Sequence, residues 1–274
     1  MHNNITEHTY NIKKKYVKMI ALILIIIFII FVFNKSDTDD KHIAIIEING
    51  IITEKNNNSK TIINLLDNAF FNKNCKAIIL KINSPGGTPV QTNIIHNYIK
   101  KLRNTKKKNI YSIIEDIGTS GAYLIATATE KIYCDPSSII GSIGVIITSF
   151  GFVETLNKIG VERRIYKAGK HKAIMDPFTE KNKNDEIIIQ HNLELIHENF
   201  INTVKKNRPN LSTSLQEEIF SGKFWTGKDA IELGLIDGFY DIYTLSSEII
   251  DVNKTIDYNK ENIIDIIINN LFKK

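Results

Sequence analysis

A serine stands at a glycine-flanked hinge in the stretch EDIGTSGAYLIATAT, residues 115–129. Ser120 follows an apolar run and precedes a helix of small residues that opens with Gly121 and Ala122. Such a serine can be an N-cap, because its oxygen accepts a hydrogen bond from the amide of N2 or N3. It can also be a nucleophile, with the unpaired N–H groups of the helix N-terminus stabilising the oxyanion that forms. Position alone favours the cap, whereas Gly121 and Ala122 clear space that a cap does not need.

A second glycine-rich stretch, NSPGGTP at residues 83–89, also follows an apolar run. Gly86 and Gly87 carry no side chain, so their backbone N–H groups can approach a ligand closely. Pro-Gly-Gly is also a common turn, and that interpretation requires no ligand. If the stretch belongs to a site, the N–H groups of Gly87 and Gly121 are candidate oxyanion donors, since open α/β sheets bind ligands at the carboxyl ends of their strands.

A nucleophilic serine needs a base, and the candidate lies in YKAGKHKAIMDPF, residues 166–178. No histidine occurs between Ser120 and His171, which leaves a lysine as the main alternative. Lys172 adjoins an apolar stretch, where burial would lower its pKa and leave a neutral amine able to accept a proton. A lysine in a lysine-rich loop is nevertheless usually a solvated surface group. His171 is the other possible base, although adjacent residues on an extended chain point apart.

The elements that must position these residues follow from apolar periodicity. Ile-rich runs separated by helical stripes predict an α/β fold with a parallel sheet. The predicted strands are residues 42–53, 76–83, 109–116 and 131–135, and the helices between them are residues 59–71, 88–103 and 120–129. Beyond them the pattern predicts a helix at 149–160, a strand-like segment at 161–169, and helices at 185–206 and 226–237. Residues 241–274 form an Asn- and Ile-rich C-terminal tail whose structure the pattern does not define.

Composition excludes several classes of protein. The chain has 274 residues, of which 43% are hydrophobic, enough for one substantial core. The net charge is +5, and lysines at residues 13–18 supply much of it, so no basic patch remains to bind nucleic acid. The histidines and cysteines show no metal-ligand spacing. Cys75 and Cys134 each lie beside a strand-like run, which favours two buried thiols over a disulfide.

The N-terminus carries an apolar segment. Residues 19–33 are apolar without interruption, and Tyr16 and Val17 extend the run to about the length that spans a bilayer core. The preceding lysines predict that residues 1–15 are cytoplasmic, that 16–33 are a single transmembrane anchor, and that the rest lies outside after a linker at 34–41. A cleaved signal peptide is the alternative, but no small-x-small cleavage pattern follows the run.

Taken together, these motifs resemble signal peptide peptidase A, the serine-lysine peptidase family of bacterial membranes, in its short single-domain form. The matching pieces are IEINGII, LKINSPGGT, DIGTSGAYLIATAT, KIYCDPSSIIGSIGVI, YKAGKHKAIMDPF and FWTGKDAIELGLID, in the family's order across residues 42–240. The resemblance implies a core akin to those of crotonases and Clp proteases, with extra helices. It also implies that Ser120 is the nucleophile, Lys172 the general base, Ser142 the serine that orients the lysine, and Gly87 an oxyanion donor. The family often has a small residue where this chain has Thr88, which would alter the neighbouring pocket.

The resemblance further implies a membrane-anchored serine endopeptidase that degrades cleaved signal peptides outside the cytoplasmic membrane. Such an enzyme uses acyl transfer to Ser120 and needs no cofactor or metal. Its partners would be apolar peptides, the membrane and further copies of the chain in a ring, where Ser120 and Lys172 of one site can come from neighbouring subunits. The alternatives are a crotonase-like acyl-CoA enzyme and a catalytically silent membrane scaffold of the same fold.

Overall fold

A computed structural model describes residues 15–24 and 40–260 of the chain. The chain divides into two compact units, residues 1–41 and 42–274. In the first unit, residues 15–24 are helical. None of the helices in the described ranges is long and apolar enough to cross a membrane. Residues 25–33 of the predicted anchor at 16–33 lie outside the described residues, so the transmembrane helix stays a prediction.

The second unit is built on one mixed, mostly parallel sheet, as the sequence predicts. The strands are β1 (His42–Asn49), β2 (Cys75–Ser84), β3 (Asn109–Thr119), β4 (Lys131–Cys134), β5 (Ile139–Gly141), β6 (Phe224–Thr226) and β7 (Thr255–Asp257). In the sheet they are ordered β6-β5-β3-β2-β1-β7, with β4 also paired to β3. Only the β5–β6 pairing is antiparallel among the pairs that the structure describes. Isoleucines dominate β1 to β3, and they are buried on both faces, as expected of parallel strands covered on two sides.

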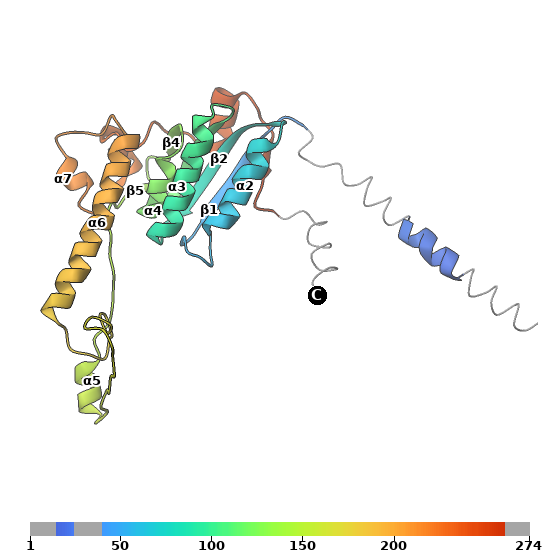
Figure 1. The fold of residues 1–274 in the computed structure, drawn as a ribbon. Coiled ribbons are helices and arrows are strands. Elements are labelled where there is room, and N and C mark those ends of the chain that lie inside the picture. Colours follow the sequence, from blue (N-terminus) through green and yellow to red (C-terminus); the bar gives the residue numbers. More distant parts are fainter. Residues whose placement is uncertain (1–14, 25–39, 261–274) are drawn as a thin grey trace, which may run out of the picture. The chain divides into compact units, whose positions relative to one another are not determined.

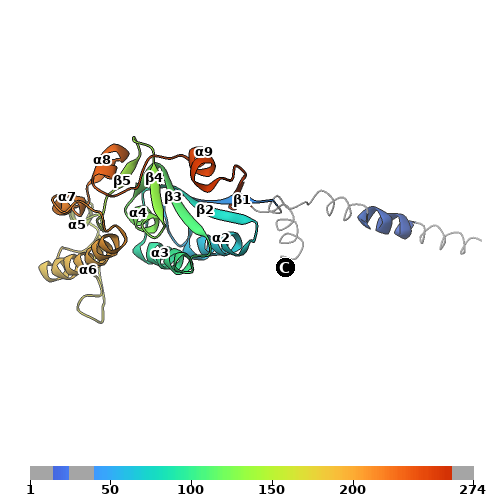
Figure 2. The same ribbon diagram turned by 90° about the horizontal axis from the view of Figure 1, so that it is seen from above.

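Helices cover one face of this sheet. Figure 2 shows α2 (Ser59–Phe71) and α3 (Pro89–Asn104) side by side below the strands, next to the short α4 (Gly121–Ala126). The Asn58 side chain caps α2 by accepting from the Thr61 amide, and a proline at the first position starts α3. Their apolar stripes bury the main core against the sheet. Cys75 and Cys134 belong to this core as free thiols, as predicted.

The opposite face is covered by the C-terminal segment. Residues from Tyr240 to Val252, which include α9 (Ile242–Thr244) and the π-helix η2 (Leu245–Ile250), pack on a second apolar cluster. β7 then pairs with β1, and the Tyr258 hydroxyl lies 2.9 Å from Nε2 of the buried His42. Residues 241–260 of the predicted tail are therefore part of the folded unit, while residues 261–274 lie outside the described residues.

An arm, defined here as residues 145–182, leaves the sheet after β5 and carries α5 (Val153–Lys158). Figure 1 shows the arm extending away from the sheet, with the long helix α6 (Lys183–Asn207) leading back to the core. The predicted helix at 185–206 is confirmed by α6, whereas the helix predicted at 149–160 is shorter than expected, since only Val153–Lys158 are helical. The strand-like segment at 161–169 is wrong, because on the arm it has no neighbouring strand among the described residues to pair with. Of the apolar stripe of α6, only Phe200 and Val204 are buried, since the N-terminal half of the helix lies with the arm.

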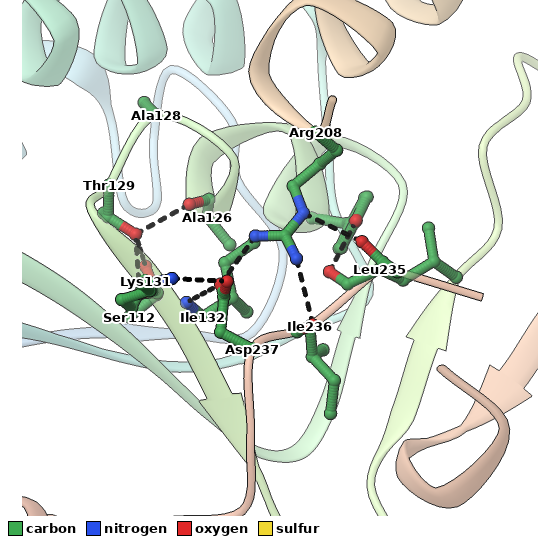
Figure 3. A network of polar contacts seen from close by, with 12 residues as sticks. Ser112, Ala126, Ala128, Thr129, Lys131, Ile132, Arg208, Leu235, Ile236 and Asp237 are labelled. Atoms are coloured by element: carbon green, nitrogen blue, oxygen red, sulfur yellow. Dashed lines mark hydrogen bonds and ion pairs between the residues drawn. The ribbon is translucent and has the colours of Figure 1, made fainter. Parts of the chain in front are cut away.

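A polar network fixes the return of the chain to the core after α6, α7 (Gln216–Ile219) and α8 (Gly227–Glu232). Figure 3 shows Arg208, at the end of α6, bound to the Asp237 carboxylate at 2.6 Å. Arg208 also donates to the carbonyls of Gly234 and Ile236, and Asp237 accepts from the Ile132 amide at 2.9 Å. The Arg208–Asp237 pair thus joins the end of α6 and residues 234–237, which follow α8, to β4.

Candidate active site

Ser120 forms the hinge between β3 and α4. Its backbone lies at φ 52° and ψ −125°, a sparsely populated region for a residue with a side chain. Its side chain makes no capping hydrogen bond to α4, so the N-cap interpretation is wrong. Strained strand-to-helix turns of this kind present a serine oxygen to a substrate in other hydrolases. The geometry therefore favours the nucleophile.

The Gly86–Gly87 turn lies directly against this hinge. A Cβ at Gly86 would stand 2.8 Å from the Gly121 nitrogen and 2.9 Å from the Ser120 Cβ, so only glycine fits. Gly86 also has φ +100°, which glycine adopts without strain. The buried Ser84 hydroxyl accepts from the Gly86 amide at 3.1 Å and fixes the turn.

Two backbone donors near the hinge, the amides of Gly87 and Gly121, have no acceptor among the residues that the structure describes. Ile52 bridges to the turn through its own amide and carbonyl, bonding Gly86 O and Thr88 N at 2.9 Å each, and this pairing leaves out the Gly87 amide. Gly121 opens α4, where the first N–H groups have no partner within the helix. Within the described part of the chain, neither amide has an acceptor. Both amides are thus available to bind an oxyanion, and that role stays a prediction.

Ser142 lies beside the same hinge. The Ser120 amide donates to the Gly141 carbonyl at 2.8 Å, which places the next residue, Ser142, close to Ser120. Ser142 has φ +50°, a second strained serine, and its amide donates to the Lys223 carbonyl at 2.9 Å. Trp225 packs against Gly141, where a Cβ would lie 3.0 Å from the ring, and the Lys223 ammonium lies 4.1 Å from the ring centroid.

Lys172 lies elsewhere in the chain, on the arm. Its side chain is exposed, and among the described residues it forms no hydrogen bond with Ser120 or Ser142. Its neighbour His171 bonds Asp185 through Nδ1 at 2.5 Å. This bond attaches residues 166–178, called here the lysine segment, to the first turn of α6. The structure of the single chain thus brings together Ser120, the oxyanion candidates Gly87 and Gly121, and Ser142. Lys172 lies apart from them.

A second contact holds the lysine segment together. The Asp176 carboxylate accepts from the Phe178 amide and from Arg163 at 2.9 Å, and these bonds hold the pKa of Asp176 below its usual range. The charged carboxylate therefore persists at neutral pH and keeps the segment bound to residue 163.

The comparison with known proteins decides the family. The model of peptidase family S49 matches residues 102–251, more than half of the chain, including Ser120, Ser142 and Lys172. A protein from Synechocystis sp. named as a protease is 32% identical over 197 residues, which cover 72% of this chain and 69% of that protein. The chain belongs to peptidase family S49. Its mostly parallel α/β sheet fits the fold that the family resemblance implied.

Other relatives of this S49 peptidase are longer. The protein named Na(+)/H(+) antiporter NhaA from Brucella melitensis is 47% identical over 179 residues, covering 65% of this chain and 24% of that protein. A protein from Enterococcus faecium named for the signal peptide peptidase SppA is 29% identical over 209 residues, covering 72% of this chain and 60% of that protein. The chain therefore spans about a quarter of the Brucella relative and less than two thirds of the Enterococcus one.

Three residues of this S49 site were not found by sequence reasoning. Ser84 had a usable signal, because a serine two residues before a glycine in a turn often accepts from that amide. Asp185 and His197, which binds the Ile143 carbonyl at 3.0 Å, had none, because both act through contacts across long loops.

Proposed function

We propose that this S49 peptidase is a membrane-anchored endopeptidase with a Ser120–Lys172 dyad that degrades cleaved signal peptides outside the cytoplasmic membrane. The observation that carries the proposal is the strained, uncapped Ser120 beside the free amides of Gly87 and Gly121. A strained serine and unpaired N–H donors both lower the stability of the fold, and such features cluster at active sites, where they contribute to the reaction.

The reaction is acyl transfer followed by hydrolysis. Neutral Lys172 takes the Ser120 proton as the oxygen attacks the scissile carbonyl, and the oxyanion binds the Gly87 and Gly121 amides. The ammonium then gives its proton to the leaving amine, and the peptide bond breaks to leave an acyl-serine. A water, deprotonated by Lys172, releases the acid and regenerates the hydroxyl. Ser142 accepts from or donates to the lysine amine and keeps it directed at Ser120.

The lysine of each site comes from a second copy of the chain. Asp185 holds the lysine segment and His197 holds the segment after Ser142, and the two are twelve residues apart on α6. At 1.5 Å per residue they are separated by about 18 Å along the helix. A dyad within one chain would break one of these contacts, whereas the arm extends outward, where it can reach a neighbour. A neighbour would also bury the exposed Lys172, which favours the neutral amine.

The proposed substrate and location are supported by the N-terminal segment, by a relative and by the surface of the arm. The apolar run at 16–33 has the length of a single membrane anchor, and the lysines before it favour a cytoplasmic N-terminus with the peptidase unit outside. The Enterococcus relative is named for a signal peptide peptidase. Exposed apolar side chains on the arm, such as Ile146, Phe150 and Ile159, suit contact with further copies in a ring and with apolar peptides.

The experiment compares the full-length protein with its Ser120→Ala and Lys172→Ala variants on a synthetic signal peptide. Both variants should be inactive, while the wild type cleaves the peptide and is labelled at Ser120 by a fluorophosphonate. Co-expression of the two variants should restore part of the activity, because some neighbouring pairs then join an intact serine to an intact lysine. An unlabelled wild type would favour the scaffold instead, and mixed assemblies without activity would place the dyad within one chain.

A further inference from the structure

His197 marks the point where the chain leaves the core for the arm. Its Nε2 lies 3.0 Å from the carbonyl oxygen of Ile143, a fully buried residue. Three residues later Ile146 is 86% exposed, so Ile143 is the last well-anchored position before the arm. Because a carbonyl only accepts, the imidazole must carry a hydrogen on Nε2 to make this bond.

The His197–Ile143 hydrogen bond holds the residue that directly follows the strained Ser142. On one side, the Ser142 amide donates to the Lys223 carbonyl, and the preceding Gly141 carbonyl accepts from Ser120. On the other side, His197 holds the Ile143 carbonyl. A residue with a side chain keeps a φ of +50° only where its neighbours are fixed, because the chain otherwise relaxes to a commoner conformation.

We propose that His197 is a positioning residue of the active site. By holding the Ile143 carbonyl, it keeps Ser142 in the left-handed conformation from which its hydroxyl meets the amine of Lys172. This inference rests on the proposed Ser-Lys function and adds to it a residue of α6 that touches neither the peptide nor the reacting atoms.

The kinetic consequence is specific. Ser142 contacts the base and not the peptide, so a misplaced Ser142 slows proton transfer and leaves peptide binding unchanged. Loss of the His197 bond should therefore lower kcat and leave KM as it was. A hydrogen bond of ordinary strength corresponds to roughly a fivefold change in rate, and a displaced catalytic group can cost about 100-fold.

The test uses a matched pair of variants in the full-length protein. His197→Gln keeps an N–H donor at similar reach, whereas His197→Met has similar length and no donor. The Gln variant should keep kcat close to that of the wild type, and the Met variant should lose about fivefold or more, with equal KM and equal circular dichroism. His191→Met, at an exposed position on the same helix, is the control and should behave as the wild type.

Several results would overturn the proposal. Equal kcat in the Met variant and the wild type would show that the bond does not matter for catalysis. A Gln variant as slow as Met, or a rise in KM alone, would exclude the donor role. If Met fails to fold while Gln folds, the bond holds the fold rather than Ser142. An inactive wild type would instead reject the Ser-Lys function itself.

Discussion

Replacing Ser120 with glycine should stabilise the protein while abolishing its activity. The perturbation exploits the backbone at φ 52° and ψ −125°, which alanine cannot relieve because it keeps the Cβ. A residue in such a region costs about 1–3 kcal/mol. Glycine relieves this strain, but it offsets about 0.5–1 kcal/mol of the relief, because an unfolded chain with glycine has more conformational freedom to lose on folding. Ser120→Gly should thus exceed Ser120→Ala in unfolding free energy by about 1–2 kcal/mol.

The assay is thermal unfolding of the full-length variants followed by circular dichroism. A gain of 1 kcal/mol raises Tm by about 2–4 °C for a unit of roughly this size. Ser120→Ala should match the wild type, because the serine side chain makes no capping bond that could be lost. The control is Ser137, an exposed turn residue whose φ is not positive. At this position the Ser137→Gly variant should be less stable than the Ser137→Ala variant. Equal or lower stability of Ser120→Gly relative to Ser120→Ala would refute the strain argument.

Three further outcomes are expected. Lys172→Arg should abolish peptide cleavage although the charge is kept, because arginine does not deprotonate at workable pH, and a still active variant would point to another base. Gly86→Ala should lower kcat/KM by about 100-fold or more through collision with the hinge; Gly50→Ala, which has a positive φ but open space around it, should cost stability only. Burial raises the pKa of Asp237, but bonds from Arg208, Ile132 and Lys131 outweigh burial and hold the pKa below its usual value. The stability that the charged carboxylate contributes is therefore complete above about pH 4, and it is lost as the pH falls further. Urea midpoints measured from pH 6 downward should therefore drop more steeply for the wild type than for Asp237→Asn, which should be less stable by about 3 kcal/mol at pH 7 because it leaves the Arg208 charge buried.

The sheet and the serine side of the site were predictable because they depend on local sequence. Ile-rich runs define β1 to β3, and a buried parallel strand leaves little choice of element. Glycines at the ends of β2 and β3 then meet because parallel strands end at one edge of the sheet.

Features that depend on tertiary context were not predictable. The conformation of Ser120 depends on Gly86, in the turn after β2, and on Gly141, the last residue of β5, and both lie far from it in sequence. The segment at 161–169 has the composition of a strand, but a strand forms only where a partner edge is available. The position of Lys172 depends on where the arm points, and no pattern in its own residues records that direction.

The pairing of β1 with β7 has a consequence for the order in which the protein is made. β1 opens the peptidase unit, yet its edge is closed only by residues 255–257, and the second face of the sheet is covered only by residues around Leu245. A nascent chain that has emerged as far as residue 240 already carries Ser120, Ser142 and Lys172, but it still exposes Ile43, Ile45 and Ile79 to water. Until residues 241–260 arrive, the sheet lacks both its edge strand and the cover of its second face. Synthesis of the C-terminal segment therefore times the appearance of a stable peptidase.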